Sequence, residues 1–177
     1  MTPGTAVLMA RYNRWMNQRM YDAARTLPPQ EAMRDRGAFF GSVFHTLNHI
    51  AAGDTIWLHR FAQHPEAGAL REALARFPAP ASLRQEMAPA LDGLQAYRAA
   101  LDEVIDQWAH ALTPEQLAAP LTYRNMAGQA HSKPLGALVQ HFFNHQTHHR
   151  GQASTLLFQA GVDVGATDLL AVIPDAT

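Results

Sequence analysis

Histidine is the residue type that stands out in this chain of 177 residues. There are ten histidines, and five of them lie between His131 and His149. Imidazole nitrogen is a ligand for zinc, nickel, iron and copper. The sequence contains no cysteine, which excludes disulfide bonds, thiolate catalysis and cysteine-containing zinc sites. A metal ion in this protein would therefore be held by nitrogen and oxygen atoms.

The pair His145 and His149 has the spacing that brings two imidazoles to one side of a helix. At about 100° per residue, His149 falls inside the apolar arc of its segment and His145 at the edge, whereas His141 and His148 lie further round. Two histidines one turn apart can offer two nitrogens to one divalent ion. Structural histidines, hydrogen-bonded in the core or at the surface, are the alternative. A metal site would need further ligands from another helix.

Four amphipathic segments are expected to position these side chains. Apolar residues at intervals of three and four predict helices over residues 5–27, 39–61, 82–112 and 132–161. Pro28 and Pro29 end the first of them, and Gly161 ends the last. Ser82 and Ser132 are the expected N-caps of the third and fourth. Pro89 implies either a kink in the third helix or a regular part that begins near the proline.

The remaining segments predict little further structure. Leu121–Arg124 and Gln129–His131 flank a turn-forming stretch and predict a small hairpin before the last helix. Residues 63–81 form a connection, and residues 162–177 form a tail that is expected to lie over the helices. The sequence therefore predicts an all-α protein, an antiparallel four-helix bundle that forms a single domain over residues 1–177.

Composition excludes several classes of function. Fourteen Lys and Arg residues against fifteen Asp and Glu residues give a net charge of -1, which leaves no basic footprint for nucleic acid or an anionic membrane. No signal peptide and no apolar run of membrane-spanning length occurs, so we expect a cytoplasmic protein. No nucleophile elbow, phosphate-binding loop or dinucleotide fingerprint is present, which disfavours serine catalysis and nucleotide binding.

Three blocks of sequence carry a family resemblance. They are Tyr12–Asn17, then Thr46–Ile50 with Asp54 and Trp57, and Phe143–Gln152. Together they resemble the DinB family of damage-inducible bacterial proteins over residues 9–161, a family distinct from the translesion polymerase of the same name. The resemblance implies a bundle of the DinB/YfiT type with a divalent metal held by three histidines. Carried over to this sequence, these are His49, His145 and His149.

The resemblance also suggests what such a site does. Three imidazoles leave a coordination position open for water or substrate, and the expected ion is zinc or nickel, with iron and copper as the other options. Relatives include low-molecular-weight thiol transferases, so a metal-dependent hydrolase or thiol transferase acting on a small molecule or thiol is expected. The alternatives are a stress-related metal-binding protein without turnover and an interaction protein, a homodimer like some relatives, in which the histidines are structural.

Other polar residues could support the site. Asp54 and Arg19 each fall within the apolar stripe of their helix, and a buried charge requires a partner, so we expect them to pair. Support of a ligating histidine is the alternative role for Asp54. His148 and Arg150 belong to the last matching block. Each could donate to a ligand, line a pocket or face solvent, and solvent exposure is the simplest interpretation for both.

Overall fold

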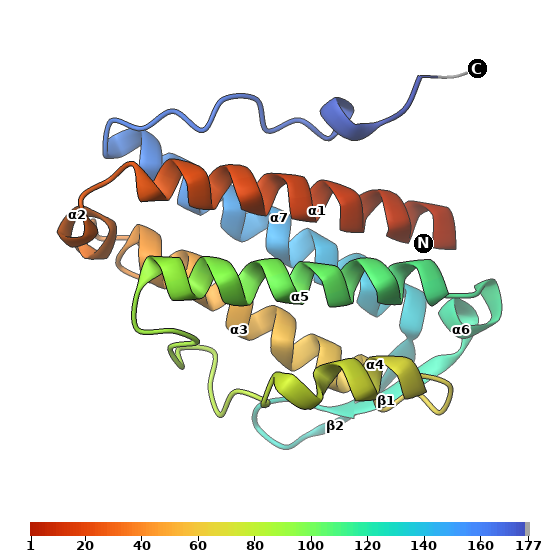
Figure 1. Ribbon diagram of the computed structural model, residues 1–177. Helices are drawn as coiled ribbons and strands as arrows, with labels where there is room; N and C mark the ends of the chain where they lie inside the picture. The colour runs from red at the N-terminus through yellow and green to blue at the C-terminus, as the bar shows by residue number, and fades with distance from the viewer. Residues whose placement is uncertain (176–177) are drawn as a thin grey trace.

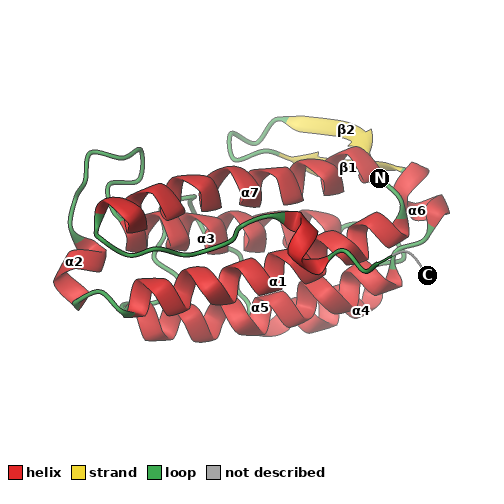
Figure 2. Cartoon of the chain, turned by 90° about the horizontal axis from the view of Figure 1, so that it is seen from above, coloured by secondary structure: helices red, strands yellow, loops and turns green. Residues whose placement is uncertain are grey.

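The computed structural model describes residues 1–175, most of which are helical (Figure 1). The four long helices are α1 (Pro3–Arg25), α3 (Val43–Phe61), α5 (Leu91–Ala111) and α7 (Leu135–Gln159). Helix α1 contacts α5 and α7, and α3 contacts the same two helices, so each long helix lies beside two others (Figures 1 and 2). The four segments predicted from the apolar periodicity thus correspond to the four long helices.

The directions of the helices differ in part from the antiparallel arrangement expected from the sequence. Helix α1 runs antiparallel to α5, and α3 runs antiparallel to α7, whereas α3 and α5 run in the same direction, as do α1 and α7 (Figure 1). The reason is the long connection between Phe61 and Leu91, which returns along the molecule before α5 begins (Figure 1). A connection of this length permits parallel neighbours, as a short loop would not.

Short elements occupy the connections that the sequence analysis left without structure. They are α2 (Pro29–Met33), α4 (Gly68–Ala73), the 3₁₀ turn η1 (Leu74–Arg76), α6 (Pro114–Ala118) and the 3₁₀ turn η2 (Leu169–Val172). In α6 the side chain of Thr113 accepts from the Gln116 amide while the Gln116 side chain accepts from the Thr113 amide. This reciprocal cap satisfies two amides that a five-residue helix could not satisfy internally.

Helix α3 begins at Val43 rather than at residue 39. The Ser42 side chain accepts from the His45 amide and caps the helix, and Gly41 before it has a φ of 82°. A positive φ is accessible to glycine without strain but breaks a helix. Phe39 and Phe40 therefore lie in a loop in front of α3, where the Arg36 amide donates to the Gly41 carbonyl.

Helix α5 begins at Leu91, two residues after Pro89, which settles the choice that the proline left open. Ser82 is not its N-cap. Instead, the Asn48 side chain of α3 donates to the Gln85 carbonyl and accepts from the Met87 amide, at 2.8 Å each. These two bonds fasten residues 83–87 against α3 as an irregular turn rather than a helix.

The hairpin before α7 is confirmed and is longer than predicted. Strands β1 (Pro120–Arg124) and β2 (Ala130–Pro134) pair antiparallel, with Tyr123 opposite His131. Ser132 lies within β2, so it is not the N-cap of α7, and Pro134 precedes that helix without a side-chain cap. At the other end, Gly161 has a φ of 84° and ends α7 as expected.

The tail after α7 lies along α1, as predicted (Figure 1). The Tyr12 hydroxyl donates to the Thr167 carbonyl at 2.5 Å, and Arg19 donates to the Val164 carbonyl at 2.6 Å. The side chains of Val164 and Val172 are buried by this contact. The tail therefore covers part of the apolar stripe of α1.

Candidate metal centre

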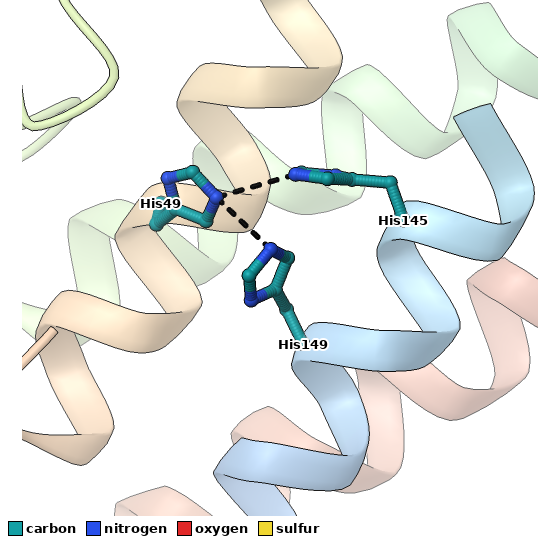
Figure 3. Close-up of side chains that lie close together, drawn as sticks. All are labelled: His49, His145 and His149. Carbon is teal, nitrogen blue, oxygen red and sulfur yellow. Dashed lines mark hydrogen bonds between the residues drawn. The ribbon is translucent and has the colours of Figure 1, made fainter. Parts of the chain in front are cut away.

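Three histidines from two helices converge at one point between α3 and α7. The Nε2 atom of His49 lies 3.3 Å from that of His145 and 3.2 Å from that of His149 (Figure 3). Potential ligand nitrogens from all three lie within 4.8 Å of one another. The side chains point toward each other although His49 is about a hundred residues away in sequence. The three predicted ligand residues thus form a group that could bind a metal ion.

The hydrogen bonds on the far side of two rings define which nitrogens are free. His49 Nδ1 lies 3.2 Å from the Leu83 carbonyl, and His149 Nδ1 lies 2.7 Å from Gln152 Oε1. Because both partners are acceptors, each Nδ1 carries the proton, and in the neutral ring each Nε2 has a bare lone pair. Two lone pairs then face each other at 3.2 Å, an arrangement that a cation between them would stabilise.

A shared proton does not supply that cation at neutral pH. The pKa of His49 is lowered to about 4, chiefly by burial and in addition by the charges of His149 and Arg84, while the bond to Leu83 offsets part of this effect. Burial, with the neighbouring histidines, lowers the pKa of His145 to about 3. Burial also lowers the pKa of His149. The three imidazoles are therefore neutral near pH 7, the state in which imidazole ligates metal.

The spacing of the nitrogens fits a tetrahedral ion. With Zn–N distances of about 2.0–2.1 Å, two nitrogens on neighbouring corners of a tetrahedron lie about 3.3 Å apart. The two Nε2–Nε2 distances from His49 are 3.2 and 3.3 Å. In the described part of the chain, no Asp or Glu joins the three histidines in this group. The donor set is therefore three imidazoles, as in catalytic zinc sites with three protein ligands.

Two residues from neighbouring segments shape the space around the imidazoles. The Phe40 ring stacks on His49 with ring centres 3.9 Å apart and meets His149 edge-on at 5.5 Å. Gly53, one turn after His49 in α3, leaves room for His145, because a Cβ added there would lie 3.0 Å from the His145 Cε1 atom. Phe40 therefore covers the cluster on one side, and a side chain at position 53 would push His145.

The polar residues singled out beside the histidines have other surroundings. Asp54 is fully buried and pairs with Arg98 of α5 at 2.5 Å, so the predicted pair with Arg19 is wrong. Arg19 instead donates to the tail, which covers its side of α1. His148 is exposed, and its Nε2 atom lies 3.4 Å from Gln152 Nε2. Arg150 is buried and donates to Asn13, so the expectation that Arg150 faces solvent is wrong.

Several residues that shape the site were missed in the sequence analysis. Phe40, Gly53 and Leu83 act through tertiary contacts that no periodicity reveals. Gln152 could have been found, because it stands three residues after His149 on the same helix, where its side chain can reach the preceding turn. Arg98 also had a signal, since Asp102 follows it at the four-residue spacing of a helical ion pair.

No helix of residues 1–175 combines the length and the apolar character needed to cross a membrane. The chain matches the model of the DinB family over residues 1–175. It is 28% identical over 165 residues to Protein DinB of Bacillus subtilis (strain 168), covering 92% of this chain and 90% of that protein.

A solved structure supports the fold. The crystal structure of a DinB-like protein from Bacillus cereus ATCC 10987 superposes with a TM-score of 0.52 at 19% identity, covering 85% of this chain and 89% of that one. At this identity the likeness concerns the fold alone. With the match to the family model over residues 1–175, the sequence places this chain in the DinB family.

Proposed function

We propose that this protein binds one divalent metal ion through His49, His145 and His149 and uses it in an enzymatic reaction on a small molecule. The observation that carries the proposal is the convergence of three imidazoles, in which the Nε2 atoms of His149 and His145 lie 3.2 and 3.3 Å from that of His49. Zinc or nickel is the proposed ion, with iron or copper as further options, because neutral imidazole suits all four. The proposal includes the DinB-type four-helix bundle as scaffold and the cytoplasm as location.

The reaction that we propose is hydrolysis or transfer of a low-molecular-weight thiol. A bound ion would act as a Lewis acid, which activates water for hydrolysis or a thiol for transfer. The chain's own contribution is to hold the rings in place. Leu83 and Gln152 orient the His49 and His149 imidazoles through their Nδ1 atoms, and Phe40 excludes water from one side.

Space for a small molecule exists beside Phe40, the residue that stacks on His49, although none of the three clustered histidines lines it. Two cavities of about 530 Å³ each flank the Phe39–Phe40 segment, and Phe40 lines both. One lies between this segment and Leu83, and the other extends along α7 past Gln152. Volumes of this size are typical of sites for small molecules. We propose that a metabolite-sized compound reaches the ion from one of these cavities past Phe40.

Metal analysis of the purified protein tests the first part of the proposal. After reconstitution without an affinity tag or chelator, we expect about one equivalent of ion for the native protein and for His141→Ala, whose exposed ring lies one turn before His145. The His149→Ala variant should lose the ion. Less than about one tenth of an equivalent in the native protein would reject the site.

Turnover assays test the second part. Thiol acceptors and ester or amide substrates should be converted by the native protein and His141→Ala but not by His149→Ala. Metal binding without conversion of any of these classes would favour the alternative of a non-catalytic metal-binding protein. Size-exclusion chromatography with light scattering measures the molar mass of the protein in solution and so tests the homodimer that the family resemblance implies.

A further inference from the structure

Six buried polar side chains form a closed ring through the four long helices. Each is at most 4% exposed. They are Asn13 of α1, Asp54 of α3, Arg98 and Asp102 of α5, and Gln146 and Arg150 of α7. The ring therefore begins and ends on α7, the helix that carries two of the three clustered histidines.

The contacts can be followed from one helix to the next. Gln146 Nε2 donates to Asp54 Oδ2 at 2.9 Å, and Arg98 Nη1 donates to the same oxygen at 2.5 Å. Arg98 Nη2 lies 2.9 Å from Asp102 Oδ1.

From Asp102 the ring returns through α1. Asn13 Nδ2 donates to Asp102 Oδ1 at 2.9 Å, and Asn17 donates to the same carboxylate. Arg150 Nη1 then donates to Asn13 Oδ1, which closes the ring on α7. The network is thus continuous across all four helices.

The charges within the ring balance. Two arginines face two aspartates, so no net charge is buried. Burial by itself would lower the pKa of Arg98, but Asp102 and Asp54 outweigh it and raise that pKa above its usual value. Burial lowers the pKa of Arg150 to about 10, partly offset by Tyr12, Asp54 and Asp102, so this side chain also stays charged at pH 7.

The two ring residues on α7 have a fixed relation to the clustered histidines. Gln146 directly follows His145, and Arg150 directly follows His149. On a helix, two pairs with the same four-residue spacing form two parallel stripes about 100° apart. One stripe points to the metal centre and the other to the ring. Any rotation of α7 about its axis that displaced the histidines would therefore also break the ring.

Small rotations of α7 matter because the histidine nitrogens must stay within bonding distance of the metal ion. A side-chain atom about 6 Å from the helix axis moves about 2 Å when the helix turns by about 20°. That displacement is as large as a Zn–N bond of about 2 Å. Packing of apolar side chains alone tolerates such shifts better than directional hydrogen bonds do.

We propose that Gln146 and Arg150, held by the polar ring, are positioning residues that set the rotation of α7 and thereby aim His145 and His149 at the metal ion. The inference rests on the proposed metal binding. It assigns the ring a role in the affinity and geometry of the site, beyond its contribution to folding.

The test compares variants that open the ring with one that only weakens the core. Gln146→Met and Arg150→Met remove the two hydrogen-bond donors of α7, and Arg150→Lys keeps the charge. Leu157→Ala is the control, because Leu157 is fully buried on the same helix and outside the ring. Each folded protein is titrated with Zn²⁺ against a chelating indicator and with Co²⁺, whose visible absorption reports coordination geometry.

We expect Gln146→Met and Arg150→Met to bind Zn²⁺ about 10-fold more weakly than the native protein, in the range of changes seen when groups behind metal ligands are removed. Their Co²⁺ spectra should change in band position or intensity, with partial recovery in Arg150→Lys. Leu157→Ala should unfold at lower urea yet keep the native affinity and spectrum. Native affinity and an unchanged spectrum in Gln146→Met would overturn the proposal, and so would an equal loss in Leu157→Ala.

A readout without metal separates this inference from the proposed function. In metal-free protein, long-range ¹H–¹⁵N spectra should show a single tautomer for His149, with the proton on Nδ1, and a mixture in Gln146→Met and Arg150→Met. If the native protein binds no ion, the proposed function fails, while the positioning role is judged by these spectra. Identical His149 signals in the native protein and both ring variants would contradict it.

Discussion

The polar ring and the histidine cluster both consist of polar side chains between the long helices. They differ in how the hydrogen-bonding groups of these side chains are satisfied. In the ring, two arginines meet two aspartates, and amides complete the contacts. In the cluster, the neutral imidazoles of His49 and His149 direct their acceptor atoms at each other. The ring pairs its charges within the protein, although Asp54 Oδ1 and Gln146 Oε1 find no hydrogen-bond partner within residues 1–175. In the cluster, the facing lone pairs of His49 and His149 are acceptors that suit an external cation. The ring thus stabilises the fold and, as proposed above, positions α7, whereas the cluster supplies the ligands of the proposed ion.

The largest expected effect comes from opening the ring at a charge. Asp102→Ala leaves Arg98 buried with one carboxylate instead of two, and we expect a loss of about 3–5 kcal/mol in the free energy of unfolding. Glu103→Ala is the control, because its contact with Arg14 is 3.9 Å long and half exposed, and it should change stability by less than about 0.5 kcal/mol. Urea denaturation measures both. Equal effects of the two substitutions would remove the distinction between ring and surface.

The cluster should contribute to stability only through its ion. At free Zn²⁺ of about 100 times the dissociation constant, binding to the folded state adds about 2.7 kcal/mol to the native protein. The gain should vanish in His145→Ala, because the metal then lacks one of its three ligands. Urea titrations with and without Zn²⁺ measure the difference. A gain that persists in His145→Ala would mean that the ion binds elsewhere.

The two regions should respond to acid with opposite signs. The folded-state pKa values of His49 and His145, about 4 and about 3, lie below the ordinary 6.5, so the unfolded chain binds more protons as the pH falls from 6.5 toward 4. This contribution lowers stability on acidification. Burial raises the pKa of Asp54 to about 6, despite Arg98 and Gln146, so the folded state takes up that proton first and its contribution rises on acidification.

Replacing His49 separates the contribution of the histidines to the pH dependence of stability from that of Asp54. His49→Phe should lose less stability than the native metal-free protein between pH 6.5 and 4, as measured by the melting temperature across that range. A native protein that gains stability throughout the range, or a His49→Phe variant that falls as steeply as native, would contradict the assignment of the acid response to the cluster.

The smallest expected effect concerns the space that Gly53 leaves for His145. Gly53→Ala raises helix propensity by up to about 1 kcal/mol but forces His145 to move by a few tenths of an ångström. We expect stability to change by less than about 1 kcal/mol and Zn²⁺ affinity to fall severalfold. Gly151→Ala, on α7 with nothing within 4 Å of the added Cβ, should gain stability and keep its affinity. Equal affinities in the two variants would show that Gly53 does not shape the site.

The three clustered histidines were predicted from two different kinds of signal, one local to a single helix and one that came from the family resemblance. The 3.6-residue period of α7 placed His145 and His149 together, because that relation is local to one helix. His49 required the family resemblance, because it lies at the flank of its apolar stripe and its approach to α7 depends on how two distant helices pack. Phe40, Leu83 and Gly53 were out of reach for the same reason.

The partners of buried charges were the least predictable feature. Asp54 and Arg19 were correctly placed on apolar stripes, yet a stripe does not tell which neighbour covers it. The tail covers Arg19, and α5 covers Asp54. The predicted helix ends were wrong where side chains of other elements bind the backbone. Asn48 of α3 binds the backbone of Gln85 and Met87, so residues 83–87 do not form the first turns of α5.

The returning tail has a consequence for how the chain can be cut and joined. Because it runs back along α1, the last described residues lie near the end of the molecule at which α1 begins (Figure 1). A flexible linker could connect the two chain ends there, and new ends could be opened at Ala127–Gly128, in the exposed hairpin turn. Such a circular permutant would make α7 the first long helix to emerge during synthesis, ahead of the helix that carries His49.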